Sequence, residues 1–234
     1  MVTDITATKG TRAPLSKELV LRGAVAVADA EGIEALTMRR LAEHLGVEAM
    51  SLYYHVANKE AVLDGVAETL VDEIQEELGD LGTGVDASSW KSTLREVLLS
   101  ARKVMLRHPW APAVFETRTK MSPSIVLYFE RLLGILREGG FSYDLAHHSM
   151  HALGSRALGF SHEMFQPESA EAEEEADEMF EHMLENLPYL AGMMMEIVHD
   201  DPDSTLGWCD DQTEFEFALD LVLDGLEQRL LVES

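Results

Sequence analysis

The stretch from Thr37 to Leu63 constrains the fold more than any other part of the chain. Thr37 is a favourable N-cap, and the apolar residues that follow it recur at helical spacing up to Leu45. Gly46 stands where the residue after a helix often needs a positive φ, so the first helix is predicted to end there. Residues 48–54 form a second helix that is too short to be stable unless neighbouring helices hold it. Two short helices joined by a tight turn predict a helix-turn-helix.

A third helix is predicted to start directly after this pair. Asn58 is a favourable N-cap, and the helix runs from Lys59 towards Leu78 with apolar residues on one face. The start of this helix carries Lys59 and free backbone amides, both of which suit a phosphate group. A head of three helices must bury a shared core. The expected core residues are Leu41, Ala42, Leu45, Val47, Leu52 and Val56.

The residues of this stretch resemble the signature of the TetR family of bacterial transcriptional repressors at nearly every position. The matching residues are Thr37, Arg39, Leu41-Ala42, Leu45-Gly46-Val47, Ser51-Leu52-Tyr53, His55-Val56, Asn58-Lys59-Glu60 and Leu63. The phrase SLYYHVANKEAVLD resembles the branch that includes the tetracycline repressors. The match covers residues 15–65 and is far more specific than a bare helix-turn-helix pattern. The resemblance implies an all-α protein with a DNA-binding head and a helical domain for ligand binding and dimerisation.

Two kinds of DNA contact are expected from the head. Tyrosine, histidine and lysine side chains between residues 53 and 59 can donate hydrogen bonds to phosphates. By resemblance, the residues that contact the DNA backbone are Thr37, Arg39, Tyr53, His55 and Lys59, with Tyr54 beside them. The exposed start of the reading helix is expected to face the bases with Glu48, Ala49, Met50 and Ser51.

The start of the reading helix has no Arg, Gln or Asn for a bidentate contact to a purine. Direct readout is therefore expected to rest on Ser51, Arg39 or His55, together with apolar packing against thymine methyl groups. Glu48 can accept a hydrogen bond from a cytosine amine, or it can be a solvated charge at the start of the helix.

The charge of the chain is distributed unevenly. With 18 basic and 43 acidic residues the net charge is −25, which opposes binding to a polyanion. Residues 1–65 hold 7 basic and 9 acidic groups, so most of the negative charge lies in the rest of the chain. We infer that only the head approaches DNA. Lys9 and Arg12, on an arm expected to be flexible, either reach phosphates or the minor groove or belong to a disordered tail.

The length fits a flexible arm over residues 1–14, a head over 15–65 and a helical domain over 66–234. No segment approaches the roughly 20 uninterrupted apolar residues that cross a bilayer, and the chain does not open with a signal-peptide pattern. The single Cys209 excludes an intramolecular disulfide and fits a reducing compartment. We therefore expect a cytoplasmic protein that does not bind membranes.

Beyond residue 80 the sequence predicts helices separated by clear breaks and no series of strands. The predicted helices span residues 90–107, 123–138, 142–165, 179–199 and 211–231, and a further helix opens at His108-Pro109. The acidic stretch 168–178 is expected to be a solvated connector or a frayed helix end.

The helices over 142–165 and 211–231 are candidates for a dimer interface. Their apolar residues can instead cover the core of one protomer, but the resemblance favours an interface of four helices, two from each chain. The expected interface residues are Gly154, Ser155, Gly159, Phe215, Leu219, Val222 and Leu226. A twofold dimer presents two reading heads, so its operator is expected to be a pseudo-palindrome.

An effector pocket is expected in the helical domain. His147, His151 and His162 share one face of the 142–165 helix, where they can donate hydrogen bonds to a ligand. The candidate lining is Met105, Trp110, Phe115, Phe129, His147, Met150, His151 and His162. Core packing explains the apolar members of this set equally well. The His147/His151 spacing suits a metal, but no third ligand is evident, so neither a metal nor a cofactor is predicted.

These patterns predict a homodimeric, ligand-responsive transcriptional regulator. The simplest form is a repressor that an apolar or amphipathic small molecule releases from a double-stranded DNA operator. Control by a protein partner and a constitutive or activating role fit the same residues. A metal-dependent enzyme using the His147/His151/His162 face with Glu163 is the alternative of another class. It lacks a nucleophile motif and a glycine-rich phosphate loop, so no enzymatic activity is predicted.

Overall fold

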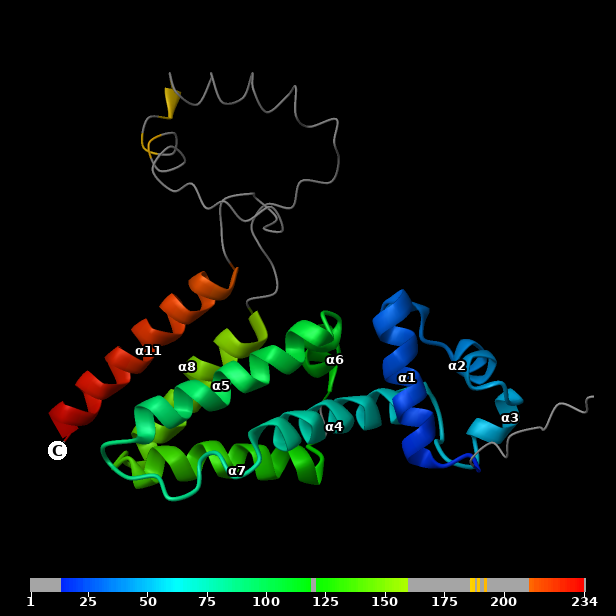
Figure 1. Cartoon of the computed structure of the whole chain (residues 1–234), viewed down its shortest axis with the longest axis horizontal. Helices are drawn as coiled ribbons and strands as arrows, with labels where there is room; N and C mark the ends of the chain where they lie inside the picture. The colour runs from blue at the N-terminus through cyan, green and yellow to red at the C-terminus, as the bar shows by residue number, and fades with distance from the viewer. Residues whose placement is uncertain are drawn as a thin grey trace, which may run out of the picture. The chain divides into compact units, whose positions relative to one another are not determined.

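The computed structural model describes residues 14–118, 121–159, 186–187, 189, 192 and 211–233. The main helices are α1 (Lys17–Glu31), α2 (Met38–Leu45), α3 (Ala49–Leu52), α4 (Lys59–Leu78), α5 (Trp90–Arg107), α6 (Ala111–Thr117), α7 (Pro123–Glu138), α8 (Tyr143–Gly159) and α11 (Asp211–Glu233), shown in Figure 1. A short 3₁₀ helix, η1 (Ile33–Ala35), follows α1. The described residues contain no strand, which confirms the predicted all-α class.

The contacts of the chain form two compact units. The first comprises Met1–Gly79 with Lys103–Phe129, and the second comprises Asp80–Arg102 with Glu130–Ser234. The first unit therefore contains the predicted head together with all of α4, the end of α5, α6 and the start of α7. This grouping differs from a division at residue 65, because α6 packs against α4 and continues the core of the head.

The helices of the head begin and end where local chemistry predicts. The Thr37 hydroxyl accepts a hydrogen bond from the amide of Arg40 at 3.1 Å, and the Asn58 side chain accepts one from the amide of Ala61 at 2.8 Å. Gly46 ends α2 with a φ of 61°, in the left-handed region. The two predicted caps and the predicted end of the first helix are confirmed, because all three depend on residues that are adjacent in sequence.

Helix α1 contacts both α2 and α4, and two glycines permit this close approach (Figure 1). A Cβ atom on Gly65 of α4 would lie 2.5 Å from Leu21 Cδ2, and one on Gly23 of α1 would lie 2.8 Å from Leu45 Cδ2. The core between these helices contains fully buried leucines and valines. Of the core residues that the sequence predicts, Leu41, Ala42, Leu52 and Val56 are buried, and Leu45 and Val47 are partly buried against them.

A polar cluster joins three segments of the first unit. His108, which is 6% exposed, follows α5 and places its Nδ1 atom 2.7 Å from Asp29 of α1 and its Nε2 atom 3.2 Å from Glu73 of α4. The Trp110 indole donates a hydrogen bond of 2.8 Å to the same Asp29 carboxylate. These contacts fix the end of α5 to the helices of the head, because a buried polar group needs a partner.

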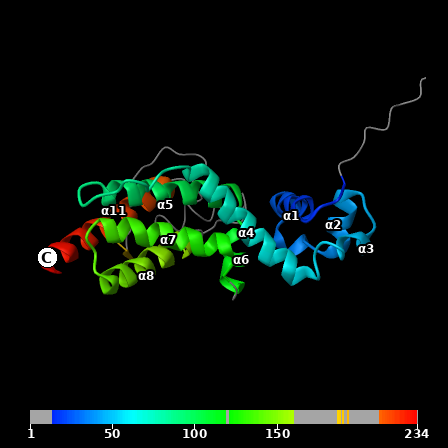
Figure 2. The ribbon, with the colours of Figure 1, turned by 90° about the horizontal axis from the view of Figure 1, so that it is seen from below.

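In the second unit, α5 and α11 run alongside each other (Figure 2), and α8 contacts α11. Trp90 at the start of α5 packs edge-on against Phe141, with ring centroids 4.7 Å apart. Gly139 allows this approach, since a Cβ atom there would lie 2.7 Å from the Trp90 side chain. Asp86 precedes α5, and its carboxylate accepts hydrogen bonds from Ser88 and Ser89.

Several predicted features lie outside the described residues. They are Lys9, Arg12, His162, Glu163, the acidic stretch 168–178, most of the predicted helix over 179–199 and Cys209. The structure describes the predicted 142–165 helix as far as Gly159. Among the described helices, none combines the length and the apolar character that a bilayer span requires.

Candidate nucleic-acid interface

Helix α3 is held by its inner side and displays its outer side to solvent. Leu52 is fully buried and Val56 is 4% exposed, so both anchor α3 in the core of the head. The amides of His55 and Val56 both donate to the Leu52 carbonyl at 2.9 Å, which closes the helix. For this reason α3 ends at Leu52, and the last residues of the predicted helix over 48–54 form a turn.

The outer side of α3 has the composition that the sequence predicts. Met50 is 69% exposed, Tyr53 46% and Tyr54 86%, and Glu48 is also exposed. Ala49 and Ser51 are half-buried. This outer surface is therefore mainly apolar and aromatic, with one carboxylate and one small hydroxyl group.

The candidate phosphate ligands lie around this helix. Lys59 is the first residue of α4, and its ammonium group has no carboxylate partner among the described residues. His55 is half-buried just before α4. Thr37 uses an oxygen lone pair to cap α2, which leaves its hydroxyl hydrogen able to donate to a phosphate. Arg39 is 89% exposed and bonds Glu43 at 3.0 Å, and an exposed pair of this kind is worth only about 0–1 kcal/mol.

Arg40, one residue further along α2, has a different role that the sequence did not reveal. Its guanidinium is bonded to the Glu31 carboxylate at the end of α1, with Nε 2.9 and 3.0 Å from the two oxygens. The hydrogen bond raises the pKa of Arg40 and lowers the pKa of Glu31. Arg40 therefore fixes α2 against α1.

The predicted effector residues occupy separate places. Met105, Trp110 and Phe115 pack against the core of the first unit, and Phe129, in the same unit, is 41% exposed. In the second unit, His147 and His151 are exposed on α8 with ring centroids 4.6 Å apart, and Met150 is half-buried. His162 lies outside the described residues.

No group of three or more potential metal-binding side chains comes together in the described part of the chain. The exposed His147/His151 pair therefore has no third protein ligand within that part. Neither histidine faces the core of its own unit, because the residues of α8 that do so are Leu145, Ala146, Ser149 and Leu153.

The residues predicted for a dimer interface divide between the inside and the outside of the protomer. Phe215, Leu219 and Leu226 of α11 are 4–8% exposed within one chain, and Val222 is half-buried. Gly154 on α8 has no atom within 4 Å of the place where a Cβ would stand. Ser155 and Gly159 belong to α8, but their side-chain surroundings are not described. The apolar side chains that α11 exposes are Phe217, Leu221, Leu231 and Val232.

Comparison with known proteins identifies the family. The model of the tetracyclin repressor-like C-terminal domain matches residues 83–230, and that of the bacterial regulatory proteins of the tetR family matches residues 20–66. The chain belongs to the TetR family. The resemblance seen in the head is thereby confirmed, and it extends through the helical domain, where the sequence offered only length and helical character.

TetR-family relatives match along nearly the whole chain. The transcriptional repressor DrrR1 of Streptomyces coeruleorubidus is 30% identical over 227 residues, which cover 94% of this chain and 80% of the relative. The class C tetracycline repressor of Escherichia coli is 29% identical, with 94% of each chain covered.

Solved structures of the TetR family share the fold. Apo ActR from Streptomyces coelicolor superposes with a TM-score of 0.74 at 25% identity, covering 96% of this chain and all of the other. ActR in complex with actinorhodin superposes with a TM-score of 0.71, covering 93% and 99% of the two chains. A small molecule is thus bound in a protein that shares this architecture.

Proposed function

We propose that this TetR-family protein is a repressor that a small-molecule effector releases from a pseudo-palindromic operator. The observation that carries the proposal is the arrangement of α3, whose Leu52 is buried while Met50, Tyr53 and Tyr54 project outward. A short helix anchored in this way and flanked by the unpaired Lys59 fits a major groove and its adjacent phosphates. A DNA-binding regulator acts where the DNA is, so we place it in the bacterial cytoplasm.

The operator should have two half-sites because we propose a homodimer. Helix α11 buries Phe215 and Leu219 in its own unit and still exposes Phe217, which is 62% exposed, and Leu221, which is 56% exposed. Apolar side chains exposed on a helix that already has a buried face mark a surface for a further partner. We assign this outer face of α11, together with Gly154, Ser155 and Gly159 of α8, to the contact with a second copy.

The effector is proposed to be apolar or amphipathic and to bind the helical domain, as supported by the fold shared with the ActR complex with actinorhodin. We retain the predicted lining by methionine, aromatic and histidine residues as part of this proposal. The effector favours a conformation in which the heads no longer fit successive major grooves. A coupling free energy of about 1–3 kcal/mol would reduce operator affinity roughly 5–150-fold.

Helix α4 provides a physical connection for this coupling. It begins next to the reading head and continues to Leu78, and its first turns are bonded to the end of α6 through Arg118. The Arg118 guanidinium lies 2.9 Å from Glu60 and 3.0 Å from Asp64. A shift of α6 would therefore be transmitted to the helix that supports α3.

Selection of genomic fragments by the purified full-length chain, at near-physiological salt, tests the proposal. We expect enrichment of one sequence, and footprinting should show two protected half-sites about one helical turn apart. Adding candidate effectors to the bound complex should release the DNA. Enrichment no greater than that of random fragments would contradict DNA-directed regulation, and enrichment of a single half-site would contradict the dimer.

A further inference from the structure

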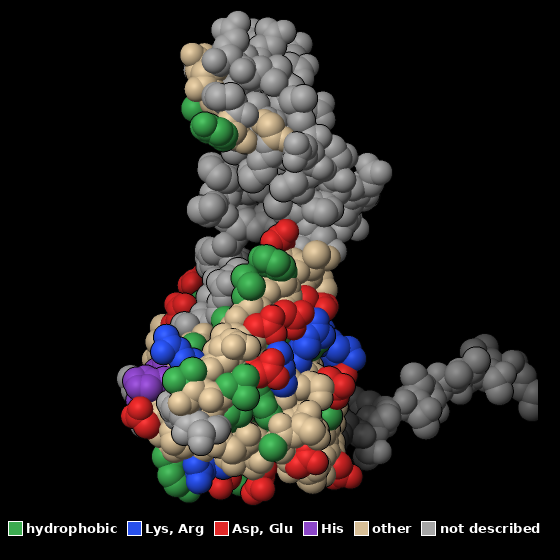
Figure 3. Space-filling model, turned by 90° about the vertical axis from the view of Figure 1, so that its left-hand side faces the viewer, with side chains coloured by type: hydrophobic (Ala, Val, Ile, Leu, Met, Phe, Trp, Pro, Cys, Tyr) green, Lys and Arg blue, Asp and Glu red, His purple; other side chains and the backbone are tan. Residues whose placement is uncertain are grey.

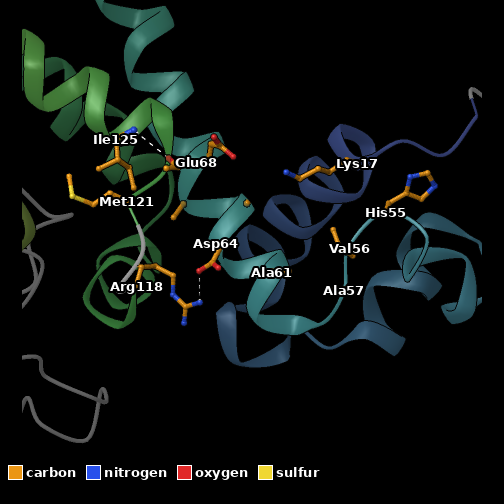
Figure 4. A pocket seen from close by; sticks show the side chains of 13 residues that line it. Lys17, His55, Val56, Ala57, Ala61, Asp64, Glu68, Arg118, Met121 and Ile125 are labelled. Atoms are coloured by element: carbon orange, nitrogen blue, oxygen red, sulfur yellow. Dashed lines mark hydrogen bonds and ion pairs between the residues drawn. The ribbon is translucent and has the colours of Figure 1, made fainter.

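A cavity of about 420 Å³ runs along one side of α4 within the first unit (Figure 4). Lys17 of α1 and His55, in the turn before α4, form the end next to the reading head. Arg118, which follows α6, and Met121 and Ile125 around the start of α7 form the other end. We call this cavity the α4 groove. None of the residues proposed for the effector pocket lines it.

The positive charge of Arg118 is already neutralised where it faces the groove. Its side chain is 10% exposed and lies within 3.0 Å of both the Glu60 and the Asp64 carboxylates. Burial disfavours the charged guanidinium, but the hydrogen bonds that it donates to these carboxylates raise the pKa of Arg118 overall. Two carboxylates around one guanidinium leave excess negative charge on these turns of α4, of which Asp64 lines the groove.

Glu68 adds a further negative charge to the same wall. It lies one helical turn after Asp64, is half-buried and lines the groove. Its carboxylate makes no hydrogen bond or ion pair with any residue in the described part of the chain. In Figure 4 it lies on the side of Met121 and Ile125, and Lys17 lies at the distant end of the groove. A half-buried carboxylate without a partner is unfavourable, and a cationic ligand would remove that cost.

We propose that the α4 groove is a second ligand site and that it binds an amphipathic organic cation. The cationic group pairs with Glu68, and the apolar body of the ligand contacts Met121 and Ile125. Small apolar residues complete the walls, namely Val56, Ala57, Ala61 and Ala67. Apolar walls with a few placed polar groups are the usual composition of a small-molecule site. An anionic ligand beside Met121 and Ile125 would instead meet the carboxylates of Asp64 and Glu68 and a guanidinium that is already paired, since Lys17 lies at the distant end of the groove.

This site is distinct from the effector pocket of the proposed function. Its walls come from the head, from α4 and from the residues that follow α6 and begin α7, all within the first unit, so an occupant touches the first turns of α4. Because α4 supports the reading head, the occupant is expected to change DNA affinity by holding these elements in one arrangement.

Fluorescence anisotropy with the full-length chain, in the absence of DNA, tests the site. The probe is rhodamine 6G, an amphipathic cation, and fluorescein is the matched anion with the same xanthene ring system. Glu68→Gln removes the charge and keeps the shape, and Glu76→Gln makes the same change at an exposed position further along α4. We expect rhodamine 6G to bind the unchanged chain and Glu76→Gln equally, and to bind Glu68→Gln about tenfold more weakly. Fluorescein should bind none of them.

Ile125→Lys gives a second test that does not depend on the carboxylate. Ile125 is partly exposed, so a lysine is tolerated by the fold while it brings a like charge into the groove. Rhodamine 6G should bind this variant at least tenfold more weakly. If Glu68→Gln melts at a lower temperature than the unchanged chain, its weaker binding could come from lost stability, and the binding by Ile125→Lys then tests the site.

Two results would overturn the site. One is that the unchanged chain does not bind rhodamine 6G, and the other is that Glu68→Gln and Ile125→Lys both bind it as tightly as the unchanged chain does. Equal binding would place the probe elsewhere, including the effector pocket. Operator binding measured on the same preparations, without probe, reports separately on the proposed repressor function. If the unchanged chain binds its operator but not the probe, the α4 groove site is contradicted and the proposed repressor function is not.

Discussion

Basic side chains of α5 in the second unit and basic side chains beside α3 in the head differ in how firmly carboxylates hold them. In the second unit, Lys91 lies 2.7 Å from both Asp224 and Glu227 of α11, and Arg95 lies 2.6 Å from Glu216 and 2.7 Å from Asp220. These hydrogen bonds raise the pKa values of Lys91 and Arg95. Figure 3 shows Lys and Arg side chains lying beside Asp and Glu side chains on this face.

In the head, by contrast, Lys59 has no carboxylate partner in the described part of the chain, and Arg39 has one on an almost fully exposed surface. A cation between two carboxylates joins helices and has little remaining attraction for an anion. An unpaired cation remains able to bind a phosphate. We propose that this difference lets a chain of net charge −25 bind DNA, because Lys59 keeps its charge available beside α3.

The largest expected effect comes from breaking the packing of the head while leaving the second unit intact. In Gly65→Val, the new side chain collides with Leu21, since even its Cβ would lie 2.5 Å from Cδ2. We expect a loss of about 1–3 kcal/mol or more in the free energy of unfolding, together with loss of operator binding. Urea denaturation and gel-shift titration measure the two effects.

The control for this change is Gly134→Ala on α7, where no atom lies within 4 Å of the new Cβ. It should leave stability unchanged or raise it by up to about 1 kcal/mol, because alanine favours a helix. Equal stability of Gly65→Val and the unchanged chain would show that the α1–α4 contact is not tightly packed.

Replacing one lysine in each unit tests the difference between a free and a paired cation. Lys59→Ala should weaken binding to all DNA sequences alike, and it should reduce the slope of log affinity against log salt by about 0.9. Lys91→Ala should leave that slope unchanged, because its ammonium group is held by α11. Affinity titrations over a series of salt concentrations measure both. A changed sequence preference in Lys59→Ala would argue for a base contact in place of a phosphate contact.

Removing a paired cation should lower the stability of the second unit. Arg95→Met leaves Glu216 and Asp220 without a partner on α5, at a cost of about 1 kcal/mol in the free energy of unfolding. The difference from the unchanged chain should shrink in 1 M salt, where charges on the surface are screened. Thermal melts at low and high salt measure it, and a difference that does not depend on salt would point to lost packing of the aliphatic stem.

The smallest expected effect is a pH dependence of stability that comes from Asp86, just before α5. Hydrogen bonds from Ser88 and Ser89 lower the pKa of Asp86 from 3.8 to about 2. The carboxylate therefore stabilises the folded chain fully above pH 4, and this contribution is lost as the pH falls towards 2. Asp86→Ala should melt at a lower temperature than the unchanged chain at pH 6, and the difference should become smaller near pH 2. A difference that stays constant between these pH values would contradict the role of the charge.

The elements of the head were predictable from sequence because their signals are local. Thr37, Gly46 and Asn58 act on residues within four positions along the chain, so their types alone mark where helices begin and end. The length of α3 was overestimated, because the turn at Leu52 depends on how deeply that side chain enters the core.

Contacts between distant residues were not predictable. Arg118 and Asp64 are 54 positions apart, and His108 and Asp29 are 79 apart, so no periodic pattern connects them. The apolar stripe of α11 shows the same limit. Its spacing correctly indicates a buried face, but Phe215 and Leu219 pack within their own unit, and the stripe itself does not specify which surface covers it.

The sequence by itself determined the class of fold and the caps and ends of the head helices, since helical periodicity and capping are properties of neighbouring residues. The tertiary structure alone decided which cations remain free, which carboxylates neutralise the others and that a groove opens beside Glu68. Charge pairing and cavities depend on distances between residues far apart in the chain, and those distances exist only once the helices have packed.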